Sequence, residues 1–301
     1  MEKRRPGVAP AANEAARDKP LMRICFASDL HGSRILYRQL GDLVRRERPD
    51  LLILGGDIFP DGQDHDPAAT QAAYVSQQLV PQVREWEQAA PGLTVACLMG
   101  NHDWAQTEAA VRAAEHTGHL VLLDLRRPWS CGGVSFLGCP LTPPTPHWVK
   151  DYERLDLDRD PVPAFEGAIW ATRADGSIAE VSAAEHFGGR PSLDTELAAA
   201  SIPQSPWILV AHAPPFDSRL DRLPNLDQPI GSRGVRRFIE QHRPLCALHG
   251  HVHDSPAVTG SFADEIGGVL CINPGQAHER LHAVLFDSDR PRVTLRHTVL
   301  A

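Results

Sequence analysis

The chain has 301 residues, of which 42% are hydrophobic and 23% charged, and its formal net charge is −8. These values are typical of a globular protein, and the negative charge argues against a nucleic-acid backbone as its main partner. No apolar run reaches the length that a membrane-spanning helix needs. Residues 1–21 combine alanine, proline and charge without an apolar core, so we expect a disordered tail there rather than a secretory signal.

Short apolar runs alternate with amphipathic stretches in the first half of the chain. We expect strands at 22–28, 50–56 and 94–100, and helices at 33–47, at about 68–89 and from about residue 104. Continuous apolar strands that are separated by helices indicate a buried sheet with helices packed outside it.

The second half repeats this alternation less regularly. We expect a helix near 235–241 and strands at 207–212, 244–250, 268–275, 282–287 and 292–300. The last two strands follow each other closely, which favours an antiparallel ending to the chain.

The pattern breaks between about residues 140 and 206. The run PLTPPTPHWV is too rich in proline for a regular helix or a central strand, and residues 141–200 hold eleven acidic and five basic residues. We interpret this stretch as an insertion on the edge of the domain. It could cover a functional site or be a plain surface excursion.

Six cysteines are scattered along the chain without a CxxC spacing. Four of them fall inside apolar runs and are predicted to be buried free thiols: Cys25, Cys97, Cys246 and Cys271. Free thiols favour a reducing compartment, so we expect a cytoplasmic protein.

Polar residues follow the predicted strands at the point where each strand ends. These residues are Asp29, His31, Asp57, Asn101, His102, His212, His251 and His253. The carboxyl ends of strands in an open α/β sheet form the crevice where ligands bind. We therefore expect these groups, which are far apart in the sequence, to meet at one rim.

The residue types at this rim suit a metal site. Imidazole and carboxylate groups together hold Mn, Fe, Zn or similar ions, and thiolates are absent from the set. Asp57 has two carboxylate oxygens and could bridge two ions. Two metals about 4 Å apart can clamp both the attacking and the leaving oxygen of a phosphoryl displacement.

In chain order, the motifs D-x-H, G-D, G-N-H-D, a lone H and G-H-x-H resemble those of the calcineurin-like metallophosphoesterase superfamily, from Arg23 to about Gly275. The resemblance implies an α/β fold of the α+β type, a four-layer α/β/β/α sandwich. The domain would span 22–301, with the acidic, proline-rich insertion at about 140–206. The segment PPTPHWVKDYERLD is similar to one in prokaryotic members.

The resemblance also implies roles for the rim residues. It places two metal ions of the Mn, Fe, Zn or Ni class, one on Asp29, His31, Asp57 and His253, and one on Asp57, Asn101, His212 and His251. A hydroxide that bridges the ions would be the nucleophile. His102 would be the general acid, with Asp103 as a helper.

Several nearby residues have simpler interpretations. We expect His249 to be structural or to support a metal ligand, and Asp103 to cap the helix near Trp104. Asp66, followed by a proline, is the expected N-cap of the next helix. The remaining expectations are a solvated loop, with a position facing the site as the alternative, for Asp61, Asp64 and His65, and a hydrophobic anchor or a stacking platform for Trp148 and Tyr152.

The motifs favour a phosphodiesterase or phosphatase that acts on a small molecule, with nucleotides among the candidates. The stretch GDIFPDGQD lacks the arginine that protein phosphatases of this superfamily carry, and HAPP is similar to the H-x-P-P of bacterial cyclic-nucleotide phosphodiesterases. Two alternatives stay open: a DNA nuclease with the same motifs, and a non-catalytic interaction module like the retromer subunit of this fold. We expect no membrane partner and no nucleic-acid partner.

Overall fold

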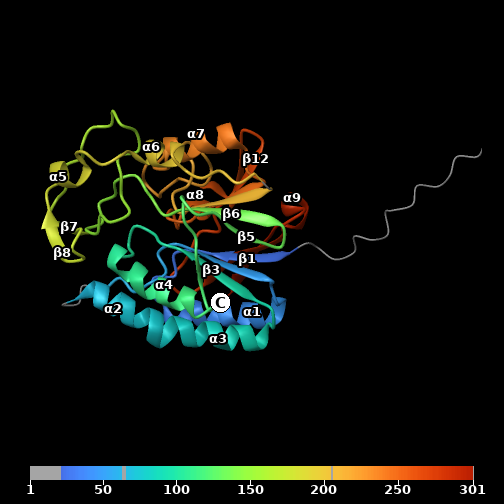
Figure 1. Ribbon diagram of the computed structural model, residues 1–301. Coiled ribbons are helices and arrows are strands. Elements are labelled where there is room, and N and C mark those ends of the chain that lie inside the picture. Colours follow the sequence, from blue (N-terminus) through green and yellow to red (C-terminus); the bar gives the residue numbers. More distant parts are fainter. Residues whose placement is uncertain (1–21, 63–65, 205, 301) are drawn as a thin grey trace, which may run out of the picture.

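A computed structural model describes residues 22–62, 66–204 and 206–300 of the chain. Two β-sheets pack face to face, and helices cover the outer face of each sheet (Figure 1). This arrangement is the expected four-layer α/β/β/α sandwich, a mixed α/β fold with parallel and antiparallel pairing. The expected tail at 1–21 lies outside the described residues.

Among the described residues, the first sheet has the strand order β14-β13-β1-β2-β3-β4. Its strands are β1 (Arg23–Ala27), β2 (Leu51–Gly55), β3 (Thr94–Leu98), β4 (Val121–Leu122), β13 (Leu281–Asp287) and β14 (Arg296–Leu300). Strands β1 to β4 run parallel, whereas β13 is antiparallel to both of its neighbours. Every residue of β2 is buried, as expected for a central strand that is covered on both faces.

The second sheet has the order β11-β12-β10-β9-β6-β5 among the described residues. Its strands are β5 (Trp129–Cys131), β6 (Val134–Cys139), β9 (Trp207–Ala211), β10 (Cys246–Leu248), β11 (Ala263–Ile266) and β12 (Val269–Ile272). The four central strands run parallel, and the hairpin partners β5 and β11 close the edges antiparallel.

Helices on the first sheet come from the long amphipathic stretches of the first half. They are α1 (Arg34–Glu47), α2 (Pro67–Tyr74), the π-helical turn η1 (Val75–Leu79), α3 (Val80–Ala89), the 3₁₀ turn η2 (Ala105–Thr107) and α4 (Glu108–His116). The expected N-cap of α2 is confirmed, because the Asp66 side chain accepts the backbone N–H of Ala69 at 3.0 Å. Such a bond satisfies one of the free N–H groups at a helix start.

The remaining helices belong to the second half of the chain. They are α5 (Ala183–Phe187), α6 (Leu193–Ala198), α7 (Arg233–His242), α8 (Ser255–Thr259) and α9 (Pro291–Thr294). Helix α9 corrects the expectation of a strand over 292–300, which begins only at Arg296. The reason is Pro291, whose fixed φ suits the first position of a helical turn and which cannot donate to a strand ladder.

Alternate side chains of each strand point into two different cores. In β1, Ile24 and Phe26 pack between the sheets, whereas Cys25 and Ala27 pack against the helices. This alternation follows from the two-residue period of a strand. The four cysteines expected to be buried free thiols are confirmed as such. No helix among the described residues combines the length and the apolar character that crossing a bilayer requires.

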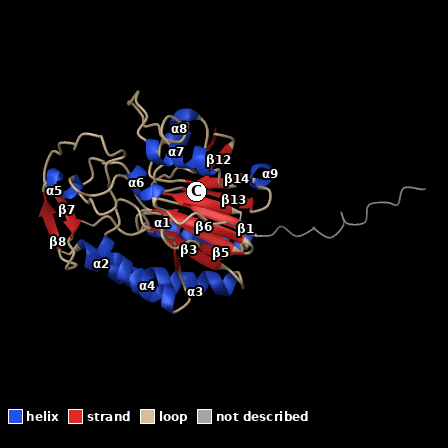
Figure 2. Cartoon of the chain, turned by 45° about the horizontal axis from the view of Figure 1, so that its top comes forward, coloured by secondary structure: helices blue, strands red, loops and turns tan. Residues whose placement is uncertain are grey.

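Within the segment 140–206, the hairpin of β7 (Ile169–Thr172) and β8 (Ile178–Val181) and the helix α5 lie at one end of the sandwich in both ribbon views (Figures 1 and 2), whereas α6 packs beside α7. Trp148 and Tyr152 both contact the main domain. The Trp148 ring packs edge-on against Trp104 with centroids 5.4 Å apart. The buried Tyr152 donates its hydroxyl to the Glu108 carboxylate at 2.8 Å.

Candidate metal centre

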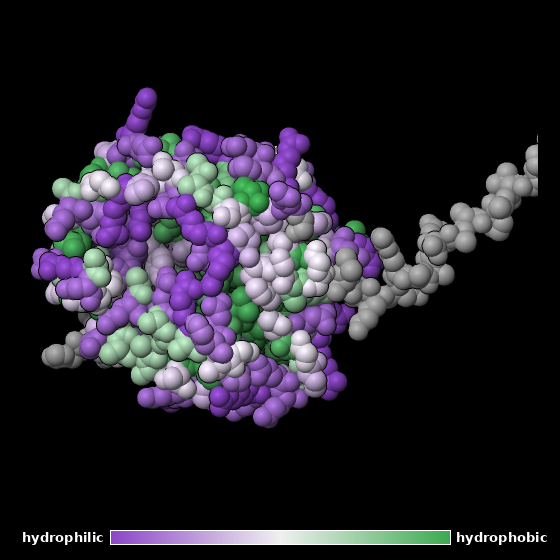
Figure 3. Space-filling model, viewed as in Figure 1, coloured by the Kyte–Doolittle hydropathy of each residue, from purple (hydrophilic) through white to green (hydrophobic). Residues whose placement is uncertain are grey.

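The eight polar groups singled out in the sequence leave the sheets at the same end. In the first sheet they follow β1 (Asp29, His31), β2 (Asp57) and β3 (Asn101, His102), and in the second they follow β9 (His212) and β10 (His251, His253). These are the carboxyl ends of parallel strands, where open α/β sheets form their binding crevices. Figure 3 shows a hollow on this face, surrounded mainly by hydrophilic residues.

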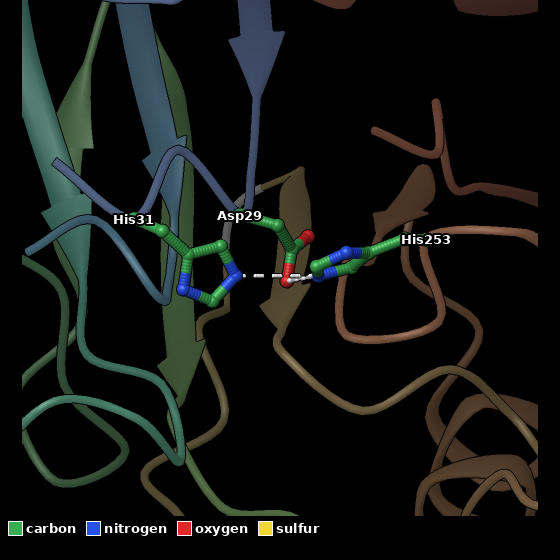
Figure 4. A group of neighbouring side chains, drawn as sticks. All are labelled: Asp29, His31 and His253. Carbon is green, nitrogen blue, oxygen red and sulfur yellow. Dashed lines mark hydrogen bonds and ion pairs between the residues drawn. The ribbon is translucent and has the colours of Figure 1, made fainter. Parts of the chain in front are cut away.

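A first group joins the β1 loop to the β10 loop. The Nε2 atom of His253 lies 3.1 Å from Oδ1 of Asp29 and 3.4 Å from Nε2 of His31. Figure 4 shows the two rings pointing toward each other across the Asp29 carboxylate, which lies just beyond the end of β1. Ligand atoms of all three residues lie within 4.8 Å of one another, so the group could hold one metal ion.

A second group is centred on Asp57. Its Oδ2 lies 3.1 Å from Nε2 of His212, and one ligand atom each of Asp57, His212 and His251 fit within 4.8 Å. The same Nε2 of His212 lies 3.9 Å from Asp29, which links the two groups. Asp57 also forms a third such cluster with His31 and His102. Asp57 is thus the residue through which the first and second groups are joined.

Several of these residues adopt a strained backbone. The φ angles are 58° for Asp29, 45° for His31, 51° for Asp57 and 68° for His251. The left-handed region is sparsely populated by residues other than glycine, and each instance costs about 1–3 kcal/mol. Strain at this many neighbouring positions is typical of a functional site, where the surrounding structure fixes side-chain directions.

Two glycines allow the carboxylates to approach the opposite loops. A Cβ atom on Gly100 would lie 2.2 Å from Oδ1 of Asp57, and one on Gly250 would lie 2.4 Å from Oδ2 of Asp29. Both distances are far below van der Waals contact. The glycines of the GNHD and GHxH motifs therefore make room for the two central carboxylates.

The donors and acceptors at this site fit a bound cation. The Nδ1–H of His212 donates to the Gly55 carbonyl at 2.9 Å, so in the neutral ring the lone pair of Nε2 faces the Asp57 oxygen. This close approach requires a positive charge between the two atoms, which either a proton on Nε2 or a bound cation supplies. The Asn101 side chain is buried, and neither amide atom has a hydrogen-bond partner among the described residues, which leaves its oxygen free to bind a metal ion.

The electrostatics of the site point the same way. Burial alone would raise the pKa of Asp29, but the adjacent His253 imidazole outweighs this effect and holds it below its usual range. Burial would likewise lower the pKa of His212, but the Asp57 carboxylate raises it to about 9. The pKa of Asp57 is likewise held low by His212 against the effect of burial, so both of these carboxylates are ionised and favour positive charge beside them.

The His102 side chain faces the same region from the loop after β3. Its backbone N–H donates to Oδ1 of Asp57 at 2.8 Å. Burial alone would lower the pKa of its ring, but Asp57 and Asp61 raise it to about 9. A ring that holds its proton at neutral pH is able to donate it, as a general acid must.

Asp103 does not cap the following helix as expected, so that interpretation is wrong. Its carboxylate accepts the backbone N–H of Gly100 at 2.8 Å and that of Phe59 at 3.3 Å. These bonds tie the loop after β3 to the loop after β2. The helical turn that begins after Trp104 has no side-chain cap.

His249 is fully buried, and its Nδ1 lies 3.0 Å from the Ala211 carbonyl and 2.9 Å from that of Ala213. It therefore ties β10 to the loop that carries His212, in line with the expected structural role.

Asp61 lies in an exposed loop, as expected, with 38% of its side chain exposed, but it also faces the site, which was the alternative. Its Oδ2 atom lies 2.8 Å from Nδ1 of His31 and 3.0 Å from Nδ1 of His102. The signal in the sequence was its place four residues after Asp57. Asp64 and His65, which shared the same expectation, lie outside the described residues.

His147 was not singled out in the sequence, yet it lies at the site. Its ring stacks on that of His102 with centroids 3.7 Å apart. Nothing in the proline-rich stretch around it signals this contact, which depends on how the segment folds back.

Comparisons with solved structures find the same fold. One solved crystal structure covers 94% of this chain and 100% of its own, with 14% identity and a TM-score of 0.63. The protein TT1561 of Thermus thermophilus covers 92% and 98%, with 16% identity and a TM-score of 0.55. A dimetal phosphatase from Danio rerio covers 94% and 100%, with 14% identity and a TM-score of 0.50. At such identities these likenesses concern the fold.

A comparison with curated proteins finds no match. The family profile of calcineurin-like phosphoesterases, in contrast, matches residues 22–255, which hold all eight rim residues and most of the chain. The chain therefore belongs to the calcineurin-like phosphoesterase family.

Proposed function

We propose that this protein is a hydrolase that uses two metal ions to cleave a phosphate ester of a small molecule. The observation that carries the proposal is the pair of adjoining ligand groups, joined through Asp57, beside a histidine that can donate a proton. When bound, two metal ions supply Lewis-acid polarisation of the phosphoryl oxygens and activation of water. The ions belong to the Mn, Fe, Zn or Ni class, since the set combines imidazole, carboxylate and amide groups without thiolate.

The chain supplies two overlapping sets of ligands in this proposal. The first set is Asp29, His31, Asp57 and His253, and the second is Asp57, Asn101, His212 and His251. Asp57 belongs to both because its two oxygens can face different ions. Its Oδ1 also accepts the N–H of His102, so the bridging carboxylate and the proton donor keep a fixed relative position.

His102 acts as the general acid that protonates the leaving oxygen. Asp61 accepts the Nδ1–H of its ring at 3.0 Å, which directs the other ring nitrogen, Nε2, away from Asp61 and toward the substrate. Asp103 supports His102 indirectly, because its hydrogen bonds to the N–H groups of Gly100 and Phe59 hold the loops of His102 and Asp57 together. It contributes through geometry and not through proton transfer.

The substrate is a small phosphodiester or phosphomonoester, and nucleotides are candidates. A cavity of about 410 Å³ adjoins the first ligand group and is lined by Asp29, His31, His253, Gln276 and His278 among others. Its volume lies at the lower end of the range for small-molecule sites, about 300–1,000 Å³. The loop after Asp57 also carries no arginine to grip a terminal phosphate, which favours diesters.

The test is hydrolysis of bis-p-nitrophenyl phosphate and of phenyl phosphate with added Mn²⁺, Zn²⁺ or Fe²⁺. We expect wild-type turnover, and a loss of roughly 10²–10⁴-fold in His102→Ala on the ester with the poorer leaving group. Metal content per chain should stay unchanged, because His102 is not a ligand. His116→Ala, an exposed histidine at the end of α4, is the matched control.

Two outcomes contradict the proposal. If wild type and His102→Ala are equally inactive with every metal, the protein is a binding module on this fold. If His102→Ala loses metal, His102 is a ligand, and the assignment of roles is wrong.

A further inference from the structure

The His147 ring covers one face of the His102 ring. The two centroids lie 3.7 Å apart and the planes are inclined by only 12°, so the rings are stacked face to face. His147 does not come from the strand ends that supply the other site residues. It comes from the proline-rich run of the segment 140–206, which reaches over the site at this point.

A fully buried ion pair holds the turn that carries His147. The Lys150 ammonium donates to the Glu153 carboxylate at 2.7 Å and to the Thr145 carbonyl at 2.8 Å, and it also donates to the His147 carbonyl. Glu153 in turn accepts the backbone N–H of Thr145 at 3.0 Å and its hydroxyl at 2.5 Å. Both charged side chains have 0% exposure.

The other side of the turn is fixed by backbone pairing. The N–H of Lys150 donates to the Trp170 carbonyl at 2.9 Å, and the N–H of Trp170 donates to the Trp148 carbonyl at 2.8 Å. The Trp148 ring packs against Trp104, two residues after His102. His147 is therefore held from both directions. Removing two charges from water costs several kcal/mol per ion, so a buried pair is weak evidence for stability as such; here it fixes a position.

The stack supplies a constraint on His102 that its hydrogen bonds lack. Asp61 accepts from Nδ1 in the ring plane, but one in-plane bond leaves the ring free to tilt about it. A parallel ring at van der Waals distance removes that freedom. The Val149 N–H donates to Nδ1 of His147 at 3.4 Å, and burial lowers the pKa of His147 to about 4, so the covering ring is neutral and does not repel His102.

We propose that His147 is a positioning residue for His102, and that the Lys150–Glu153 ion pair positions His147. The stack holds the His102 imidazole at the angle from which its Nε2 reaches the leaving oxygen. The inference rests on the proposed role of His102 as the proton donor, and it assigns to the segment 140–206 a part in the reaction.

Three substitutions of His147 in the full-length, metal-loaded protein separate stacking from polar contact. His147→Ala removes the ring, His147→Phe keeps a flat ring without nitrogens, and His147→Asn keeps a polar group without a ring. We expect His147→Ala and His147→Asn to lose roughly 10–100-fold in kcat on phenyl phosphate, the scale of a misplaced catalytic group. His147→Phe should keep most of the rate. On bis-p-nitrophenyl phosphate, whose leaving group needs little protonation, the kcat of all three variants should be close to that of the wild type.

A spectroscopic readout follows the stack without activity. In the zinc-loaded protein with ¹⁵N-labelled histidine, the His102 ring protons should shift downfield in His147→Ala and His147→Asn, because the ring current is lost, and stay in place in His147→Phe. Lys150→Met should give the same downfield shift while His147 is still present. Metal content and Tm serve as checks on folding.

The inference is overturned if His147→Asn is active and His147→Phe is not, since His147 would then be a polar substrate contact. It is also overturned if His102→Ala impairs the enzyme but no His147 variant does. If His102→Ala itself has no effect on phenyl phosphate, the proposed function fails, and the role of His147 fails with it.

Discussion

The rim of the sandwich and the segment 140–206 place their polar side chains in different ways. At the rim, each group follows a buried strand directly, and backbone pairing sets its position: Asp29 N–H donates to the Gly56 carbonyl, and His31 N–H to that of Asp57. The described part of the segment has only the short hairpin of β7 and β8 and the short helices α5 and α6. Apart from isolated backbone pairs, such as that of Val149 with Trp170, its order depends on side chains that bond to the backbone.

Buried acids supply these bonds in the segment. Asp151 accepts the N–H of Thr172 at 2.6 Å and that of Ala105 at 2.8 Å. Asp156 accepts the Ser232 hydroxyl at 2.5 Å and the N–H of Arg233 at 2.8 Å. The acidic composition of the segment is thus in part internal structure. Backbone-ordered and side-chain-ordered regions should respond differently to substitution.

The largest expected effect lies at the rim. Asp57→Asn keeps the shape of the side chain but removes the charge that, in the proposed arrangement, both metal ions share. Loss of a residue around the ligands alone costs about 10–100-fold, so we expect kcat/KM to fall by more than about 100-fold. Both ions should weaken together, as measured by metal content after dialysis. Full occupancy in Asp57→Asn would contradict the shared position, whereas the fold should stay intact because backbone pairing sets it.

In the segment, we expect the largest loss of stability from Glu153→Gln. It leaves the Lys150 ammonium buried without its counter-charge, and breaking a buried pair in this way costs about 3–5 kcal/mol. Denaturant unfolding of the metal-free protein measures the change. The double variant Lys150→Met with Glu153→Leu is the control, and it should be more stable than the single variant. If Glu153→Gln unfolds like wild type, the segment does not depend on this pair.

Acid should weaken the segment through His186 in α5. This side chain is 2% exposed, and burial, together with Arg190 and Arg154, lowers its pKa from 6.5 to about 4. In the unfolded chain, His186 binds a proton near pH 6.5, but in the folded protein it does so only near pH 4. The free energy of unfolding is therefore highest above pH 6.5 and decreases as the pH falls to 4. The difference amounts to roughly 3 kcal/mol.

The comparison variant is His186→Phe, which keeps a flat ring and binds no proton. Unfolding free energies of the metal-free proteins at pH 7.5, 5.5 and 4 give the difference between wild type and variant. It should shift by roughly 3 kcal/mol in favour of the variant toward low pH. A constant difference would show that His186 titrates normally in the folded protein.

The rim could be predicted from the sequence because each ligand-type residue stands beside a uniformly apolar strand, and sheet topology brings strand ends together. The contacts of Asp61 with His31 and His102 could not be predicted, because they are tertiary and a polar loop residue is usually solvated. Asp103 was misjudged for a related reason. Its carboxylate accepts the backbone N–H groups of Gly100 and Phe59 in the two loops and is therefore not available to cap the following helix.

The segment resisted prediction more strongly. Its strands are short, its helices have five or six residues, and its decisive contacts join side chains to distant backbone groups. His147 reaches His102 through a turn that the Lys150–Glu153 pair and the backbone pairing with Trp170 hold in place, and no period in the sequence encodes that. A site residue in an irregular segment therefore cannot be predicted from hydrophobic periodicity, whereas one at the end of a regular strand can.

The smallest expected loss of stability serves as a reference for the larger ones. Ser192 caps α6 within the same segment, where its hydroxyl accepts the N–H of Thr195 at 3.2 Å. Ser192→Ala removes this cap bond together with the bond from the Ser192 hydroxyl to Oγ1 of Thr195. It should cost about 1 kcal/mol, measured by denaturant unfolding, with kcat/KM unchanged. Asp66→Ala at the start of α2 is the matched cap near the rim, with a similar cost expected. If Ser192→Ala is as damaging as Glu153→Gln, any lost hydrogen bond unravels the segment. The buried pair then has no special part in holding His147, because its effect would only reflect how marginally the whole region is ordered.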